Sequence, residues 1–203
     1  MKKIPFQPAR SHPVPTNRVR ASFILRQSHV KSLKIRISPS LRISTFAVAS
    51  AYIWTSLAKC GSGGGGDEDE VFYYLADGRG RRNALFDPPV PKNYFGNCLG
   101  AGVVRLESRK LAAEDGFVVA AKAIDDEMNK IYDGDEFLIK PENRLPIVLS
   151  NCKDVRMLLA SGSPTFEFAE VDFGRRSTRK VEFLSMDDRT YAGADAKIYM
   201  SRG

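Results

Sequence analysis

The sequence predicts an α/β fold, a mixed sheet with flanking helices, and three segments carry this prediction. Residues 71–77 are rich in aromatic and β-branched side chains, which is typical of a strand. Residues 44–60 carry apolar side chains around most of the helix axis, which indicates a buried helix. Residues 111–132 place apolar side chains on one face at helical spacing. A chain of 203 residues is expected to build one core by default.

The N-terminal elements follow from prolines, caps and short apolar runs. Residues 1–20 hold four prolines and no acidic residue, so we expect an irregular extension there. Residues 21–26 suit a short strand, and Ser28 is expected to cap a helix that runs to about residue 35. Ser44 or Thr45 should cap the buried helix.

The rest of the chain alternates loops with strands. The glycine run of residues 61–66 should end the buried helix, and the acidic run 67–70 predicts a solvated loop. No element is assigned to residues 133–160, where the signals are mixed. Three strand candidates lie near the C-terminus, at residues 165–173, 180–185 and 197–201.

The charge is unevenly distributed along the chain. Residues 1–66 hold eleven Lys and Arg and no acidic residue, whereas the whole chain has a formal net charge of +7. A basic arm of this kind is compatible with nucleic acid, an anionic cofactor, a membrane surface or a targeting peptide. The aromatic residues of this arm do not alternate with its basic residues as a nucleic-acid stacking platform requires, so we expect no nucleic-acid partner.

Histidine and cysteine usage exclude several chemistries. Only His12 and His29 are present, so a Ser-His-Asp or Cys-His site cannot be drawn from residues 67–203. The three cysteines, Cys60, Cys98 and Cys152, show neither metal-ligand spacing nor a disulfide framework. We therefore expect no bound metal and a reducing, cytoplasmic location. No uncharged apolar run is long enough to span a bilayer, so no membrane partner is expected.

Two short motifs do not support the chemistry they suggest. The glycine run lacks the Lys-Ser or Lys-Thr that a phosphate-binding loop places on its nucleotide. Asp172-Phe173-Gly174 occurs without the other protein-kinase motifs.

From about residue 21 to the end, the order of segments resembles the C-terminal half of the BAHD acyltransferases, the plant acyl-CoA-dependent transferases. The segments that carry the resemblance are Ser44-Thr45-Phe46, Ala51-Tyr52-x-Trp54, Ala76-Asp77-x-Arg79-x-Arg81, Asp87-Pro88-Pro89-x-Pro91-x-Asn93-Tyr94-Phe95-Gly96-Asn97-Cys98, Glu114-Asp115-Gly116-Phe117 before Ala120-Ala121, Gly162-Ser163-Pro164-x-Phe166, and Val171-Asp172-Phe173-Gly174 followed by Arg179-Lys180-Val181-Glu182. The Tyr94–Cys98 run is most similar to the branch that acylates anthocyanins and other phenolic glucosides.

The resemblance implies a fold and an activity. The fold would be a chloramphenicol acetyltransferase-like half, with residues 21–203 as the C-terminal domain of a two-domain family. The activity would be acyl transfer from acyl-CoA, a co-substrate rather than a permanent cofactor, to a hydroxyl of a phenolic or anthocyanin glycoside. These small molecules would be the partners of a monomeric protein once an N-terminal half completes it.

The resemblance also directs attention to two groups of residues. The acid-free approach to the buried helix suits a CoA phosphate, with Arg42, Ser44 and Thr45 as candidate ligands, although Ser44 would also serve simply as a cap. Asp172, Phe173 and Gly174 match a structural motif of the family. We expect the Asp172 carboxylate to pair with Arg79 or Arg81 and so tie the last strands to the proline-rich loop; the alternative is that Asp172 is simply exposed to solvent.

Three features depart from the family pattern. The catalytic His-x-x-x-Asp motif is absent, because Thr16 follows His12 and Leu33 follows His29 at the Asp position. The sequence has Arg175-Arg176 where the family has Trp-Gly, and residues 82–86 look inserted. We therefore expect no catalytic residue in this chain, which would be a truncated product, a partial gene model or a degenerating copy and inactive alone. The alternative is a non-catalytic remnant or binding module.

Overall fold

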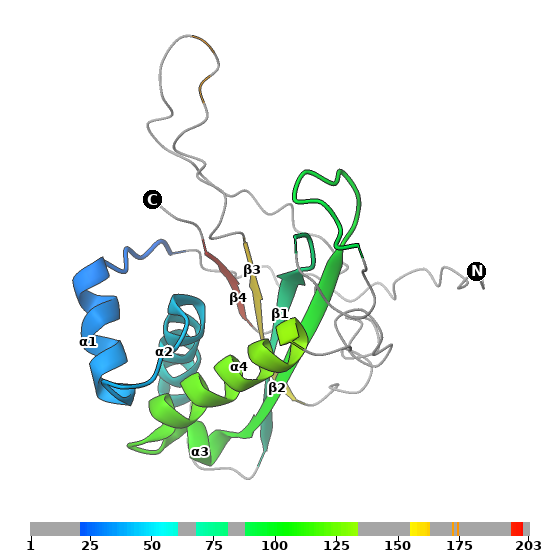
Figure 1. The fold of residues 1–203 in the computed structure, drawn as a ribbon. Helices are drawn as coiled ribbons and strands as arrows, with labels where there is room; N and C mark the ends of the chain where they lie inside the picture. The colour runs from blue at the N-terminus through cyan, green and yellow to red at the C-terminus, as the bar shows by residue number, and fades with distance from the viewer. Residues whose placement is uncertain are drawn as a thin grey trace.

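The computed structural model describes residues 21–60, 68–80, 88–133, 155–162, 172, 174 and 196–200. Its helices and strands, in chain order, are α1 (Gln27–Ile37), α2 (Thr45–Cys60), β1 (Asp69–Asp77), β2 (Leu99–Glu107), α3 (Ser108–Ala112), α4 (Gly116–Asp133), β3 (Arg156–Ser161) and β4 (Ala196–Tyr199). This mixed architecture confirms the predicted α/β class (Figure 1).

The four strands form one mixed sheet in the order β2-β1-β3-β4. β1 pairs with β2 in antiparallel register, from Asp69 opposite Glu107 to Asp77 opposite Leu99. β1 also pairs with β3, and β3 with β4, in parallel orientation. β1 and β3 therefore each have a neighbour on both edges and form the interior of the sheet.

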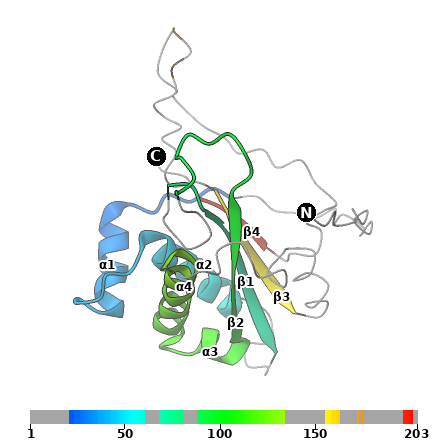
Figure 2. The same ribbon diagram turned by 45° about the vertical axis from the view of Figure 1, so that its right-hand side comes forward.

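Helices α1, α2 and α4 lie on one face of this sheet, as the two views in Figures 1 and 2 agree. α2 runs antiparallel to β1, since Phe46 near its start packs against Tyr74 and Trp54 further along packs against Phe72. Trp54 is 1% exposed, and Phe46 is partly buried against the core. The prediction of a buried helix with shielded Trp54 and Phe46 is therefore confirmed.

The sheet separates two clusters of buried side chains. The larger joins the helices to Phe72, Tyr74, Val104 and Leu158 on one face, whereas Val71, Tyr73, Met157 and Leu159 cluster on the other. Alternate residues of β1 therefore enter opposite clusters, as the two-residue period of a strand requires. Gly102 stands opposite Tyr74, and a Cβ at that position would collide with the Tyr74 ring.

The predicted helix over residues 111–132 is two helices in the structure. α3 ends at Ala112, and α4 begins at Gly116. The chain turns at residues 113–115 and brings Gly116 so close to the Leu111 carbonyl that a Cβ would clash there. The apolar pattern continued across this break because both helices bury a side chain in the same core, Leu111 from α3 and Phe117 from α4.

Other predicted elements have different outcomes. Residues 21–26 carry no regular structure, so the predicted strand there is wrong, and Phe23 and Ile24 are largely exposed. The helix expected from Ser28 is α1, but it begins at Gln27 with Arg26 at the N-cap position and without a side-chain capping bond, so the predicted Ser28 cap is wrong. The strand expected at 197–201 is β4. The strand candidates at 165–173 and 180–185 are not tested, since apart from the single residue 172 they lie outside the described residues. In the part of the chain that the structure describes, no helix has the length and apolarity needed to cross a membrane.

Candidate functional site

The N-terminus of α2 is the predicted phosphate site, and its geometry is set by Ser44. The Ser44 hydroxyl accepts a hydrogen bond from the Ala47 N–H at 3.1 Å, and the Ser44 carbonyl accepts one from the Val48 N–H at 3.2 Å. These contacts make Ser44 the N-cap of the helix. Among the described residues, the N–H groups of Thr45 and Phe46 have no hydrogen-bond partner and remain available.

An acidic side chain of this chain also reaches the start of α2. The Ser44 N–H donates to Asp125 Oδ1 of α4 at 2.9 Å, and the Ser44 hydroxyl lies 3.7 Å from the sulfur of Met128. A carboxylate is favoured at a helix N-terminus because the helix dipole is positive there. Asp125 thus joins α4 to α2 and occupies one donor of the predicted site.

Basic side chains precede this helix start in the sequence. Arg42 and Thr45 are exposed, as is Lys31 of α1. The Arg36 guanidinium lies 5.7 Å from the centroid of the Phe117 ring, so this exposed arginine also packs over a buried aromatic side chain. Arg42 is the basic residue nearest in sequence to the free N–H groups.

The second predicted group centres on Arg79, and its partner differs from the predicted one. The Arg79 guanidinium pairs with Asp77 at 2.8 Å, two residues earlier in the same turn, and no ion pair joins it to Asp172 among the described residues. This hydrogen bond raises the pKa of Arg79 further above its ordinary value. The expected ion pair between Arg79 and Asp172 is therefore wrong. The Arg79 guanidinium pairs instead with Asp77 at the end of β1.

The remaining members of that motif are placed only in part. Asp172 is exposed, and its Oδ1 accepts a hydrogen bond from the Gly174 N–H at 2.8 Å. Gly174 has a φ of 83°, a conformation that glycine adopts readily. Arg81 and Phe173 lie outside the described residues, so the proposed pairing of Asp172 with Arg81 stays a prediction.

The Asp77–Arg79 pair helps to hold the proline-rich loop that follows β1. The Arg79 guanidinium donates to the Tyr94 carbonyl at 3.4 Å, and the Gly80 N–H donates to the Val90 carbonyl at 2.7 Å. Cys98 is buried where this loop returns to the sheet, and burial raises the pKa of its thiol. The loop therefore has a hydrogen-bonded frame at its base.

A buried polar cluster was missed by the sequence prediction. Glu70 is 3% exposed, although it ends the acidic run expected to be solvated. Its carboxylate accepts hydrogen bonds from the Trp54 indole N–H at 3.0 Å and the Ser108 hydroxyl at 2.8 Å, and it pairs with Arg156. The signal available in the sequence was the strand that begins at residue 69, because alternation along it directs Glu70 to the same face as Phe72.

No cluster in the described residues has the side chains to hold a metal ion. His29 lies exposed on α1, and His12 lies outside the described residues. The described part of the chain thus offers an anion the N-terminus of α2 with the exposed Arg42 before it, and no base chemistry is assigned to His29 on α1.

Comparison with known proteins identifies relatives of the whole chain. The chain is 42% identical over 194 residues to the malonyl-coenzyme:anthocyanin 5-O-glucoside-6'''-O-malonyltransferase of Salvia splendens, covering 95% of this chain and 40% of that protein. It is 33% identical over 186 residues to the malonyl-coenzyme A:anthocyanin 3-O-glucoside-6''-O-malonyltransferase of Dahlia pinnata, covering 85% of this chain and 38% of that protein. The chain therefore spans about two fifths of the length of these relatives.

Solved structures show the same fold, and a family model covers most of the sequence. Vinorine synthase aligns with a TM-score of 0.55 at 16% identity, over 76% of this chain and 35% of that one. F. graminearum TRI101, crystallised with coenzyme A and deoxynivalenol, aligns with a TM-score of 0.50 at 14% identity, over 84% of this chain and 39% of that one. Residues 2–187 match the model of the Transferase family. The chain belongs to this family, the BAHD acyltransferases whose motifs its sequence resembles.

Proposed function

We propose that this chain supplies one half of an acyl-CoA-dependent O-acyltransferase that acts on a hydroxyl of a phenolic or anthocyanin glycoside. The observation that carries the proposal is the 42% identity, over 194 residues, to an anthocyanin malonyltransferase. The relatives that share this stretch include malonyl and coumaroyl transferases, so the proposal names the acceptor class and leaves the acyl group open.

The start of α2 is the part of the chain that would contact the CoA co-substrate. The N–H groups of Thr45 and Phe46 and the exposed Arg42 side chain provide donors and positive charge for a phosphate. The Asp125 carboxylate lies at the neighbouring Ser44 N–H and opposes an incoming anion. We therefore expect weak, salt-sensitive binding of CoA by this chain.

The chemical step needs a general base near the acceptor hydroxyl, and in the family this base is the histidine of the His-x-x-x-Asp motif. A base removes the hydroxyl proton as the oxygen attacks the thioester carbonyl, a new C–O bond forms, and the C–S bond breaks to release CoA. Neither histidine of the chain starts a His-x-x-x-Asp motif. General-base catalysis typically contributes about 10²–10⁴-fold, so we propose that the chain alone does not turn over.

The proposal is tested by binding and by complementation. The 203-residue protein should bind CoA, and Arg42→Gln should weaken that binding several-fold, whereas Lys130→Gln on α4 should leave it unchanged. Alone, the protein should form no product from malonyl-CoA or coumaroyl-CoA and an anthocyanin glucoside. Addition of the polypeptide that precedes the matched region of the Salvia splendens relative should produce transfer. Product formed by the chain alone, whether or not it survives His29→Ala, would contradict the proposed division of labour.

A second candidate function is a binding module without catalysis. Arg175-Arg176 in place of the family's Trp-Gly favours it, because two charged side chains replace an aromatic ring and a glycine. In that case CoA binding would persist and the complemented protein would still form no product.

A further inference from the structure

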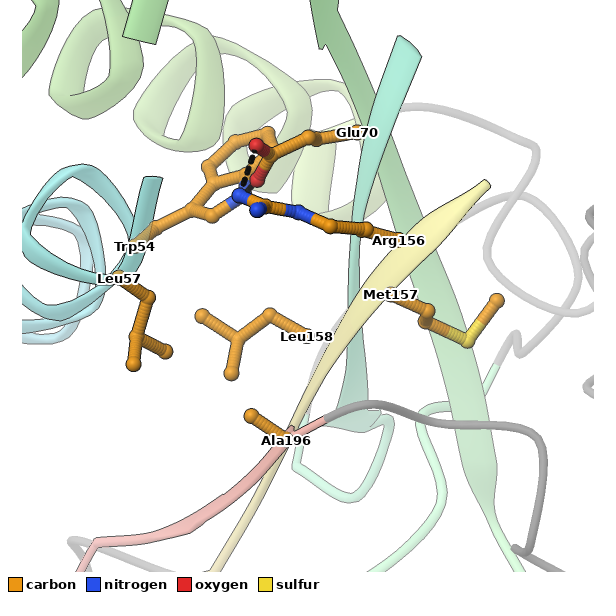
Figure 3. Close-up of a pocket in the computed structure, with 7 residues that line it drawn as sticks. All are labelled: Trp54, Leu57, Glu70, Arg156, Met157, Leu158 and Ala196. Carbon is orange, nitrogen blue, oxygen red and sulfur yellow. Dashed lines mark hydrogen bonds and ion pairs between the residues drawn. The ribbon is translucent and has the colours of Figure 1, made fainter. Parts of the chain in front are cut away.

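A small cavity, open to solvent beside Leu57, which is 41% exposed, lies between the C-terminal half of α2 and the strands β3 and β4. Its volume is about 180 Å³. Figure 3 shows Leu57 from α2 facing Leu158 from β3, with Ala196 of β4 below them. The Trp54 ring, Glu70 and Arg156 close the upper side. The walls are therefore apolar and the polar groups are gathered at one end.

The polar end presents the Arg156 N–H groups, and both oxygens of its carboxylate already accept hydrogen bonds. Both oxygens of the Glu70 carboxylate are occupied, one by the Trp54 indole and the other by the Ser108 hydroxyl and the Arg156 guanidinium. Arg156 uses a single nitrogen, Nη2, for this contact, and its other N–H groups have no partner among the described residues. Its side chain is 42% exposed, compared with 4% for Glu70, so those N–H groups remain accessible.

The polar end of the cavity has no net charge from Glu70 and Arg156. The guanidinium and the carboxylate form an ion pair, so the cavity carries one positive and one negative group at its polar end. A ligand anion near Arg156 would be repelled by Glu70, which is buried and poorly screened by solvent. A neutral acceptor oxygen receives a hydrogen bond from Arg156 without that repulsion.

From this arrangement we propose that the cavity binds a small, neutral, mostly apolar molecule with one acceptor oxygen directed at Arg156. An engineered apolar cavity of roughly 150 Å³ is known to hold benzene, so the size suits a single ring with a short substituent. Leu57, Leu158 and Ala196 would contact the ring, and the Arg156 N–H groups would hold the oxygen. This site does not depend on the proposed acyl transfer, and it uses none of the residues assigned to CoA.

The chain contains one tryptophan, which gives a direct probe of this site. Trp54 lines the cavity, so the single indole N–H signal in a ¹H–¹⁵N spectrum should shift when the cavity fills. Three probes of similar shape separate the contributions: acetophenone is neutral with an acceptor, ethylbenzene lacks the oxygen, and benzoate is charged. We expect acetophenone to bind about tenfold more tightly than ethylbenzene, since a hydrogen bond to a charged group is worth at least that factor. Benzoate should bind more weakly than acetophenone.

Two substitutions locate the binding. Ala196→Leu should fill the cavity and weaken acetophenone binding at least about tenfold, with the Glu70–Arg156 pair left in place. Ala113→Leu, in the turn between α3 and α4, adds the same side chain away from the cavity and should leave the affinity unchanged. Equal affinities for acetophenone and ethylbenzene, tighter binding of benzoate, or an indole signal that none of the probes moves would each overturn the proposal. These comparisons on the wild-type protein hold even if the Ala196 variant does not fold.

Discussion

At the scale of single residues, Glu70 joins elements that are far apart in the sequence. Its carboxylate contacts Trp54 on α2, Ser108 at the start of α3 and Arg156 on β3. A charge this deeply buried depends on its partners, because desolvation removes the stabilisation that water would give. One substitution in this cluster therefore affects two helices and two strands.

Replacing Arg156 should test that dependence. Arg156→Met keeps the aliphatic length but leaves the Glu70 carboxylate buried without its counter-charge. We expect the free energy of unfolding to fall by about 2 kcal/mol, less than for a fully buried pair, because Arg156 is 42% exposed and because Trp54 and Ser108 still donate to the carboxylate. Urea denaturation followed by circular dichroism measures the loss.

A surface pair provides the control for this substitution. Lys130 lies 3.8 Å from Glu127 and its side chain is 73% exposed. Lys130→Met should cost under about 1 kcal/mol. Similar losses in the free energy of unfolding for Arg156→Met and Lys130→Met would show that the Glu70–Arg156 pair stabilises the fold no more than a surface pair does.

The two described cysteines should differ in reactivity. Cys60 is exposed, whereas Cys98 is buried and burial raises the pKa of its thiol. The thiolate is the reactive form, so Cys98 should alkylate more slowly than Cys60 at pH 8 and need a higher pH for the same rate. Peptide mass spectrometry after timed iodoacetamide treatment distinguishes the sites. Faster labelling of Cys98 would mean that the base of the loop opens readily in solution.

Single residues also show where sequence reasoning stops. Ser44 was predicted as a cap or a phosphate ligand, and its capping hydrogen bond is present. Asp125 at the same N–H was not foreseeable, because 81 positions separate it from Ser44 and the contact depends on how α4 crosses α2. Arg79 was paired with the wrong carboxylate for a related reason: the turn at residues 78–80 brings Asp77 within reach.

At the scale of elements, α2 depends on its N-cap. Ser44→Ala removes the oxygen that accepts the Ala47 N–H, and should lower the free energy of unfolding by about 1 kcal/mol. Ser44→Gly should lower the free energy of unfolding by only a few tenths of a kcal/mol, since glycine is tolerated at the N-cap position. Denaturant unfolding of the two variants gives the comparison, and an equal loss in both would mean that the hydroxyl is not the stabilising group.

The stability that Glu107 contributes at the start of α3 should decrease in acid. The Glu107 carboxylate accepts hydrogen bonds from Lys110 and Arg109, which hold its pKa below the ordinary value. A lowered pKa in the folded state adds stability above the unfolded pKa near 4.3, and this stability is lost as the pH falls through the folded value.

Glu107→Gln should therefore be less stable than the wild type at pH 7, and the gap should narrow by pH 3. Urea midpoints of the two proteins at both pH values check this. Glu114→Gln, at an exposed carboxylate with no ion pair to a described residue, serves as the control and should show no such trend. If the difference in urea midpoint between the wild type and Glu107→Gln were larger at pH 3 than at pH 7, the pKa of Glu107 would be raised in the folded state and not lowered.

Elements were predictable to the extent that their own residues determined them. The apolar surface of α2 and the aromatic content of β1 indicated both correctly. β3 was not assigned, because its six residues, RMLLAS, are too short a run to distinguish a buried strand from a helix. Residues 21–26 have strand-like composition but pair with none of the described strands, and pairing as well as propensity decides such a segment.

At the scale of the whole molecule, the order of the sheet predicts a gradient of local stability. β1 is paired on both edges, whereas β4 has four residues and pairs with β3 alone among the described strands. Amides of β1 residues 71–75 should therefore exchange with solvent more slowly than those of β4. Hydrogen exchange read by mass spectrometry measures this, and faster exchange in β1 than in β4 would contradict the sheet order.

The same strand order has a consequence for synthesis on the ribosome. α2, β1, β2 and α4 leave the ribosome in succession and can pack as they emerge, but the strand that covers the second edge of β1 begins about eighty residues after Asp77. At typical bacterial and eukaryotic elongation rates this edge waits roughly 4–16 s for β3. Val71 and Tyr73, which the finished sheet buries beside Met157 and Leu159, are without those neighbours for that interval. During this interval the uncovered edge of β1 is available for binding by a chaperone or by a second copy of the nascent chain.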